Sequence, residues 1–440
     1  MCYGLNKTHS IGTTSMKTIT EVKKETPIVG EYDVIVAGGG PAGFSAAVVA
    51  AREGAKVCLV EQCGGVGGVA TSGMMSHWTG NTKGGFYEEI LLRSTGAGKS
   101  NLIDPEKLHG TLLEMLLEAG VEIRLYTFAV APVMEGDKVC GLITESKTGR
   151  QALLCNVLID ASGDGDIAAR AGAEFQLGRE SDSAMQPMTQ MFKVAGVDYS
   201  KAIFPGSFES KVDVPAGEIQ ALAHEKLPHP AGHVLLYQTA HPGVVTCNMT
   251  NVINVDGTKA EDLTKAQIVC RKQIPLIVDF LRKYAPGYEN CYLISAAAQI
   301  GVRETRHFIG LSTITEHDIM AARVFPDWVV TKAHFNFDIH NIKGAGLDEH
   351  GVQHHFKQPE GYTIPYGCLV PKRIKGLLLA GRLISGTHKA HSNFRVMPIC
   401  ANIGQAAGTA AAMAAARGVE PRDLPVADIQ ASLKRQGVTE

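Results

Sequence analysis

The 440-residue chain has no Cys-x-x-Cys pair, no apolar run long enough to cross a membrane and no excess of basic charge. Its ten cysteines stand singly, as at Cys58, Cys155 and Cys400, which argues against zinc knuckles, redox pairs and a disulfide framework. A net charge of −2 argues against nucleic acid as a partner. Residues 1–25 lack the apolar core of a signal peptide. We therefore expect a soluble, cytoplasmic protein with reduced thiols and no membrane partner.

One glycine motif lies in a specific setting. An apolar strand runs into Gly38-x-Gly40-x-x-Gly43, and a helix of small residues and a second apolar strand ending in Glu61 follow. This order of strand, turn, helix and strand, closed by an acid, is typical of a dinucleotide site. Gly38 permits the tight turn, Gly40 lets a pyrophosphate approach the backbone, and Gly43 lets helix and strand pack closely. The N–H groups at the helix start face the phosphates, and Glu61 is expected to accept hydrogen bonds from the adenosine ribose.

Hydrophobic periodicity extends this first region and returns to it near the end of the chain. Its further expected elements are a helix at 105–120, strands at 121–134, 138–146, 151–160 and 376–381, and a small-residue helix at 399–417.

The stretch between these parts has a different texture, with short strands and one long helix over about 262–284. Pro275 inside that helix predicts a kink or a break. Because the flanking regions share one pattern, we expect an inserted domain. The predicted fold is α/β, and its predicted limits are 1–29 for a flexible N-terminus, 30–185 and 371–440 for a Rossmann-like nucleotide-binding domain, and 186–370 for an inserted mixed α/β substrate domain.

Eight short blocks, taken in order, add a family resemblance. They lie at 34–43, 67–73, 159–166, 185–188, 299–306, 380–385, 395–398 and 404–408. Together they resemble the FAD-dependent oxidoreductase family of the two-dinucleotide-binding-domain flavoproteins, whose kin include fumarate-reductase-like and heterodisulfide-reductase-like flavoproteins. The resemblance covers nearly everything from Tyr32 to Gly418. It implies bound FAD in the Rossmann-like domain and leaves the substrate open.

The resemblance also implies a set of cofactor contacts. The loop at 67–73 is similar to the family segment that reaches the pyrophosphate and flavin, and Val130 lies on a strand that often contacts adenine. Asp164 resembles a family aspartate near the cofactor, although Asp164 and Asp166 are equally suited to cap the helix that follows. The expected contacts are Gly38, Gly40, Pro41, Ala42, Gly43, Glu61, Gly67, Gly68, Ala70, Thr71, Val130, Ala161, Gly163, Asp164, Gly381, Arg382, Met397, Ala401 and Asn402.

The chemistry is expected near the start of the last small-residue helix. The helix that begins near Met397 is implied to aim its N-terminus at the flavin, where its partial positive charge stabilises the reduced ring. His388 is similar to a family histidine and is the candidate for proton transfer. Arg395 either offsets flavin charge or grips a substrate carboxylate. The alternative is that residues 386–395 form an exposed polar loop.

Further cationic side chains come from the expected insert. Arg303 and Arg306 either line the substrate pocket, with Arg303 a catalytic candidate, or pair with Glu304 and solvent. No metal site is predicted, because His354 and His355 lack acidic or cysteine partners at ligand spacing.

The expected function is an FAD-dependent oxidoreductase that transfers hydride between flavin N5 and a small polar substrate bearing a hydroxyl or carboxylate group. The alternative is a flavin subunit that passes electrons to an iron–sulfur partner. Because no second Gly-x-Gly-x-x-Gly follows a strand, any NAD(P)H would enter the substrate pocket directly. The use of NAD(P)H or an external electron acceptor and the oligomeric state stay open, and covalent FAD is not predicted.

Overall fold

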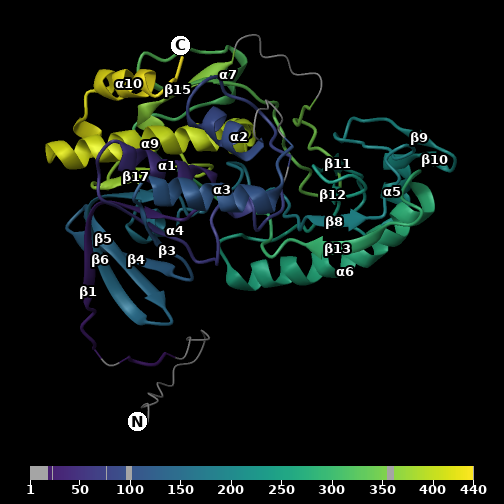
Figure 1. Ribbon diagram of the computed structural model, residues 1–440, viewed down its shortest axis with the longest axis horizontal. Coiled ribbons are helices and arrows are strands. Elements are labelled where there is room, and N and C mark those ends of the chain that lie inside the picture. The colour runs from purple at the N-terminus through teal and green to yellow at the C-terminus, as the bar shows by residue number, and fades with distance from the viewer. Residues whose placement is uncertain (1–17, 22, 76, 96–101, 354–360, 440) are drawn as a thin grey trace.

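The computed structural model describes residues 18–21, 23–75, 77–95, 102–353 and 361–439. His354 and His355, which were considered above as metal ligands, lie outside the described residues. Figure 1 shows two units side by side along the long axis: a larger one with most of the strands and helices, and a smaller one in which α6 underlies an antiparallel sheet.

The larger unit is built on a sheet in which β1 and β6 are parallel neighbours, with β2 parallel to β1 and β17 parallel to β6. The carboxyl-terminal half of β1 and all of β2 and β17 are buried, as is typical of parallel strands covered on both faces. This confirms the expected α/β class. The parallel strands are β3 (Glu122–Arg124), β2 (Val57–Val60), β1 (Ile28–Ala37), β6 (Gly149–Asp160) and, beside the end of β6, β17 (Leu377–Leu379). Beside the start of β6, β5 (Lys138–Ser146) runs antiparallel to it, and β4 (Phe128–Glu135) runs antiparallel to β5.

Two helices of small residues cover this sheet and lie against each other. They are α1 (Pro41–Arg52) and α9 (Met397–Arg417), and Figure 1 shows α9 above α1 with α3 beside them. A Cβ atom at Gly404 or Gly408 would press into the backbone of α1, so glycine is what allows the close approach. The neighbouring helices are α2 (Phe86–Thr95), α3 (Pro105–Glu118), α4 (Asp166–Arg170), α8 (His388–Phe394) and α10 (Val426–Arg435).

The smaller unit has its own hydrophobic core, whose members run from Phe192 to Cys291. Its sheet order is β11-β12-β8-β13, all antiparallel. Its elements are β8 (Phe192–Ala195), β9 (Asp213–Val214), β10 (Gly217–Glu218), α5 (Ile219–Lys226), β11 (Leu236–Gln238), β12 (Val245–Cys247), α6 (Ala260–Tyr284) and β13 (Tyr292–Ala296). The predicted break at Pro275 is wrong, because α6 runs through it; Figure 1 shows the helix curving along the sheet.

Residues 308–370 were expected in the insert, yet their buried side chains share the core of the larger unit. The elements of this stretch are α7 (Glu316–Met320), β15 (Trp328–Ala333), β16 (Tyr362–Pro365) and η2 (Tyr366–Leu369). The elements not yet named are η1 (Gly68–Ala70), β7 (Phe175–Leu177), β14 (Arg306–Phe308) and η3 (Pro421–Asp423). The limits 186–370 stay a prediction, and the packing favours a shorter insert. None of the helices in the described part of the chain is long and apolar enough to span a bilayer.

Candidate active site

The turn between β1 and α1 forms an open cradle. Gly38 has φ +100°, and a Cβ atom there would lie 2.5 Å from the Ala161 carbonyl oxygen. Gly40 is different: a Cβ atom added to it would meet nothing within 4 Å. No side chain caps the start of α1 at Gly40, so its first N–H groups are available to a ligand. A backbone that is open beside free helix N–H groups fits a pyrophosphate.

Three further segments meet this cradle. A Cβ atom on Gly68 would lie 3.1 Å from the Gly40 Cα, and one on Gly381 would lie 3.2 Å from the Ala42 Cβ. The turn after β6 touches Gly38 as described. The loops after β1, β6 and β17 therefore converge at the carboxyl edge of the parallel strands, where open α/β sheets bind ligands.

Glu61 joins the end of β2 to the cradle. Its Oε2 accepts a hydrogen bond of 2.7 Å from the N–H of Gly39, and its Oε1 accepts one of 2.8 Å from the N–H of Cys63. The carboxylate is nearly buried. The expected contact with a ribose stays a prediction, made by a carboxylate that also fixes the turn.

Asp164 is held in a polar cluster beside the cradle. Its Oδ1 accepts hydrogen bonds of 2.7 Å from Arg382 Nη2 and 2.7 Å from Thr305 Oγ1. The Nε of Arg382 is buried and has no hydrogen-bond partner in the described part of the chain. A Cβ atom on Gly163 would lie 2.8 Å from the Arg382 guanidinium, so glycine is required there. An ionised donor without a partner fits a site that takes an anionic ligand.

The alternative that Asp164 or Asp166 caps α4 is wrong, because Asp160 does so. Its Oδ2 accepts 3.0 Å and 2.7 Å hydrogen bonds from the N–H groups of Ile167 and Ala168. Asp160 is fully buried at the end of β6, and burial raises the pKa of its carboxyl. The sequence analysis missed it; the signal was an acid at the end of an apolar strand.

Three residues that were expected to contact the cofactor make hydrogen bonds within the protein. Asn402 donates to Thr82 Oγ1 at 3.0 Å and to the Gly84 carbonyl at 3.2 Å, and it accepts from the Tyr87 N–H at 3.0 Å. The remaining two are bound as well: Thr71 Oγ1 donates to the Val66 carbonyl, and the Val130 carbonyl accepts from Arg170. Both N–H groups of the Asn402 amide are thus used within the protein, and its expected contact with the cofactor stays a prediction.

No side chain caps the start of α9. Met397 is its first residue, Pro398 follows, and no side chain hydrogen-bonds the first turn. Ala401 is buried one turn later. A helix N-terminus with open N–H groups carries the partial positive charge that the sequence analysis invoked.

The segment at 386–395 is not an exposed loop. It forms α8, capped by Thr387, and both of its histidines are buried. His388 Nδ1 donates to Glu304 Oε1 at 2.5 Å, and His307 Nε2 donates to the same oxygen at 2.8 Å. His391 lies edge-on to His307 with 4.5 Å between ring centroids. We call these four residues the Glu304 cluster. The sequence analysis named Glu304 and His307 only as part of a charged run.

Charges in the Glu304 cluster stabilise one another. Burial alone would lower the pKa of His388, but the hydrogen-bonded Glu304 carboxylate raises it on balance. Burial would raise the pKa of Glu304, yet the hydrogen bonds from His307 and His388 hold it well below its usual range. Burial lowers the pKa of His391 far below that of an ordinary histidine, so this ring is neutral. His388 and Glu304 are therefore an ion pair under mildly acidic conditions.

Glu304, His307 and His388 also bring together donor atoms that could hold a metal ion. Two ligands placed about 2.1 Å from a tetrahedral metal would lie about 3.4 Å apart. The 2.5 Å and 2.8 Å separations here are shorter and fit hydrogen bonds. The arrangement thus favours a hydrogen-bonded cluster.

A second cluster lies where α8 ends, which we call the arginine pair. Arg395 Nη2 donates to the Asp338 carbonyl and to its Oδ2, both at 2.9 Å. Arg303 Nη1 donates to the Pro187 carbonyl at 2.5 Å and to Thr189 Oγ1 at 2.8 Å. The buried Nε of Arg395 has no partner among the residues described.

The arginine pair carries more positive than negative charge. Burial, and then the neighbouring Arg395, lower the pKa of Arg303 to about 10, which leaves it protonated at neutral pH. Burial, and then the Arg303 cation, lower the pKa of His340 to about 4, so His340 is neutral although its Nε2 lies 3.4 Å from Asp338 Oδ2. Burial would raise the pKa of Asp338, but its interactions with His340, and then with Arg395 and Arg303, hold that pKa well below its usual range. Two guanidinium groups that interact electrostatically thus share one carboxylate as counter-charge, and Arg395 bonds it directly.

Gln186 connects the two clusters. Its N–H donates to Glu304 Oε2 and its Oε1 accepts from the N–H of His340, both at 3.1 Å. Its Nε2 is buried without a partner in the described ranges. Arg306 belongs to neither cluster, because it bonds the Asp164 carbonyl at 2.7 Å and Asp166 Oδ1 at 2.9 Å. The predicted pairing of the arginines with Glu304 is therefore wrong.

Residues 33–433 match the family described as FAD dependent oxidoreductase. The chain belongs to this family. It is 40% identical over 79 residues to a fumarate reductase (cytochrome) of Shewanella frigidimarina, a match that covers 17% of this chain and 14% of that protein. It is 24% identical over 391 residues to the tRNA uridine 5-carboxymethylaminomethyl modification enzyme MnmG of Dichelobacter nodosus, with 81% and 58% covered.

This FAD dependent oxidoreductase spans less than two thirds of the length of those curated relatives. Its fold is similar to the solved structure of a geranylgeranyl bacteriochlorophyll reductase-like protein from Thermoplasma acidophilum, at 14% identity and a TM-score of 0.46, with 93% of this chain and 84% of that chain covered. FAD is its cofactor. The residues fit that cofactor through the cradle at Gly40, the uncapped start of α9 and the unpartnered Nε of Arg382.

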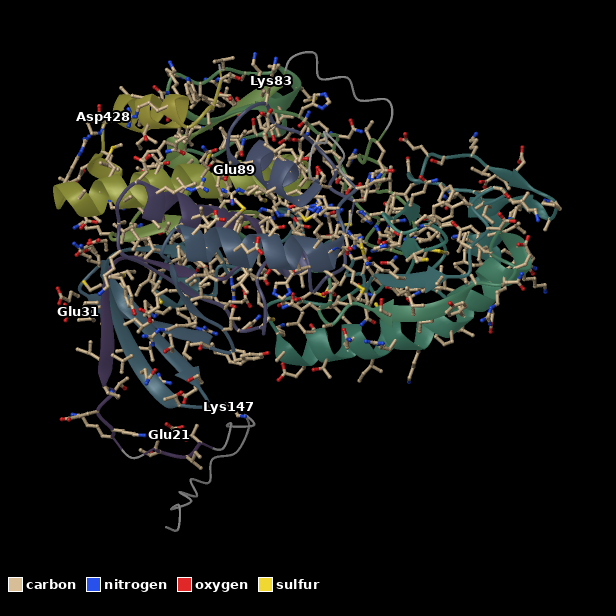
Figure 2. All side chains as sticks on the ribbon, in the orientation of Figure 1. Glu21, Glu31, Lys83, Glu89, Lys147 and Asp428 are labelled. Atoms are coloured by element: carbon tan, nitrogen blue, oxygen red, sulfur yellow. The ribbon has the colours of Figure 1, made fainter. Side chains whose placement is uncertain are left out.

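Two of the hollows formed by the described residues of this flavoprotein lie away from the glycine turn. One, of about 190 Å³, is lined by Arg52 and Glu89, which form a salt bridge of 2.7 Å; Glu89 is labelled in Figure 2. The other, of about 310 Å³, is lined by Phe208 and His233 of the smaller unit. Only the second borders residues that contact the arginine pair, since Phe208 lies against His340.

Proposed function

We propose that this oxidoreductase transfers hydride between its flavin and a small anionic substrate that Arg303 and Arg395 hold. The observation that carries the proposal is the excess positive charge of the buried arginine pair. An uncompensated buried charge is costly, so a carboxylate that entered would gain more here than in water. FAD, when bound, supplies the two-electron chemistry, and the chain binds, orients and exchanges protons.

Arg395 is the side chain best arranged to meet that carboxylate. One edge of its guanidinium is fixed by Asp338, while its Nε keeps an unused N–H. The ion pair orients the planar group before a substrate arrives, which lowers the entropy lost on binding. Arg303 supplies the second charge and is itself held by Thr189 and the Pro187 carbonyl.

His388 is the proposed proton donor and acceptor. Its Nδ1 is fixed by Glu304, and its Nε2 makes no hydrogen bond to any residue that the structure describes. A histidine whose tautomer and orientation are set by a carboxylate has one nitrogen left for proton exchange. The raised pKa of His388 favours its acid form.

The test is anaerobic mixing of the holoenzyme with hydroxy acids, sugars, amines and NAD(P)H while the oxidised flavin absorbance is followed. We expect a carboxylate-bearing compound to bleach the flavin, Arg395→Gln to need a much higher concentration of it, and the surface control Arg417→Gln to match the wild type. Arg417, the last residue of α9, pairs with Asp428 of α10 and has no contact with the arginine pair among the residues described. His388→Ala should keep FAD and lose turnover.

Two results would contradict this function. Equal bleaching of wild type and Arg395→Gln by the same acid would remove the arginine pair from substrate binding. Bleaching by none of the compounds would favour the alternative, a flavin subunit that serves an iron–sulfur partner. Full turnover in His388→Ala would remove the proton role of that histidine alone.

A further inference from the structure

The hollow beside Phe208 lies one side chain away from the arginine pair. Its volume of about 310 Å³ is at the lower end of the range for small-molecule sites. Gln220 of α5 and Leu347 of the opposite loop form part of its wall, with Phe208 and His233. The Phe208 ring contacts His233 at 4.9 Å and His340 at 5.0 Å between centroids, edge-on in both cases.

The backbone of Phe208 is tied to the carboxylate of the arginine pair. Gln353 Oε1 accepts from the Phe208 N–H and from Ser207 Oγ, both at 2.9 Å. Gln353 Nε2 donates to Asp338 Oδ1 at 2.9 Å. One glutamine therefore fixes both Phe208 and the carboxylate that orients Arg395. Phe208 forms the partition between the hollow and the charges behind it.

The ring of His233, which packs against Phe208, has a defined protonation state. The ring is only 3% exposed, and its Nε2 lies 3.1 Å from the Asn248 carbonyl oxygen. A carbonyl only accepts, so Nε2 carries the proton. Burial lowers the pKa of His233 to about 3, so the ring is neutral and Nδ1 keeps a bare lone pair. That buried Nδ1 has no partner within the described chain.

We propose that this hollow is the subsite for the distal part of the substrate, with a substrate hydroxyl donating to His233 Nδ1 while its carboxylate reaches Arg303 and Arg395 past Phe208. The inference rests on the proposed function and narrows its substrate class to hydroxylated carboxylic acids. A lone pair that nothing in the protein satisfies selects a ligand with a donor. Phe208 is then the residue that decides which substrates pass.

The experiment measures binding to the oxidised holoenzyme through the perturbation of the flavin absorption spectrum. The probes are gluconate, which has a carboxylate and hydroxyls; hexanoate, which has the carboxylate alone; and sorbitol, which has hydroxyls alone. We expect gluconate to bind about 10-fold more tightly than hexanoate, the gain from one buried hydrogen bond. Sorbitol should bind weakest, because it leaves the arginine pair uncompensated.

Two matched variants assign the preference to His233. His233→Leu should remove the advantage of gluconate and leave hexanoate unchanged, whereas His233→Asn keeps an acceptor near the Nδ1 position and should retain part of it. Retained FAD and an unchanged melting temperature show that each variant is folded. Equal binding of gluconate and hexanoate by the wild type, or an unchanged preference in His233→Leu, would overturn the inference.

A separate variant tests the partition. Phe208→Ala should bind the bulkier 3-phenylpropionate at least about 10-fold more tightly than the wild type, since the ring no longer blocks the way. Unchanged affinity would overturn the role of Phe208. Arg395→Gln separates the two levels: if it weakens no carboxylate, the proposed function fails, whereas weakened carboxylates with no hydroxyl preference refute the subsite alone.

Discussion

Replacing Glu304 by Gln removes the charge on which the Glu304 cluster depends. The side chain is fully buried and accepts charge-assisted hydrogen bonds from His388 and His307. Loss of one partner of a buried ion pair, softened by an amide that still accepts one bond, should cost about 3 kcal/mol of the free energy of unfolding. For a chain of 440 residues this corresponds to a melting temperature lower by about 3 °C.

The loss should depend on pH with a definite sign. The folded pKa of His388 is raised, so its contribution to stability is complete below the ordinary histidine value of 6.5 and is lost as pH rises through the raised value. The folded pKa of Glu304 is lowered, so its contribution is complete above the ordinary value of 4.5 and is lost as pH falls through the lowered one. The difference between wild type and Glu304→Gln should therefore be largest between pH 4.5 and 6.5.

Urea unfolding at a series of pH values measures this difference. The matched control is Glu180→Gln, because the exposed Glu180 accepts a 2.8 Å hydrogen bond from the backbone N–H of His388 and raises the pKa of its ring less than Glu304 does. Its loss should be small at every pH. A flat difference for Glu304→Gln across the range, or an equal loss in the control, would refute the ion pair between Glu304 and His388.

Four further variants test the cradle, the cap and the arginine pair. Gly40→Ala adds a Cβ atom that meets no protein atom, so its melting temperature should be unchanged while FAD fluorescence titration shows about 10-fold weaker binding; Gly43→Ala, which would press on the Gly38 carbonyl, should lose both. Asp160→Asn should lower the free energy of unfolding by about 2 kcal/mol in urea, because both carboxyl oxygens accept hydrogen bonds and the amide keeps only one acceptor oxygen. Arg395→Gln should raise KM for an acid substrate far more than it lowers kcat in steady-state assays, and a pure kcat effect would contradict a binding role.

Local signals allowed much of the larger unit to be predicted. The turn at Gly38, the helix α3 and the return of the chain at β17 and α9 each depend on a pattern within about 20 residues, and each is in the structure. The prediction of a break at Pro275 was wrong because the buried face of α6 packs on the core of the smaller unit on both sides of that residue.

The clusters could not be predicted in the same way. His388 meets Glu304 from 84 residues away, and Gln186 reaches the N–H of His340 across 154 residues. In a single sequence, a buried polar residue with a distant partner looks the same as a solvated loop residue. This is why the sequence left open the alternative that residues 386–395 form an exposed loop. Burial also decides protonation, so His233 and His340 gave no sign that they are neutral.

The close contact of α1 with α9 has a consequence for biosynthesis. The surface expected to accept the coenzyme begins at Pro41 on α1, and the helix that packs against it, α9, begins at Met397. At about 5–20 residues per second, the ribosome needs tens of seconds to make the roughly 350 residues between them. Throughout that time α9 cannot cover the flank of α1, so coenzyme capture must wait until residues 397–417 have been made.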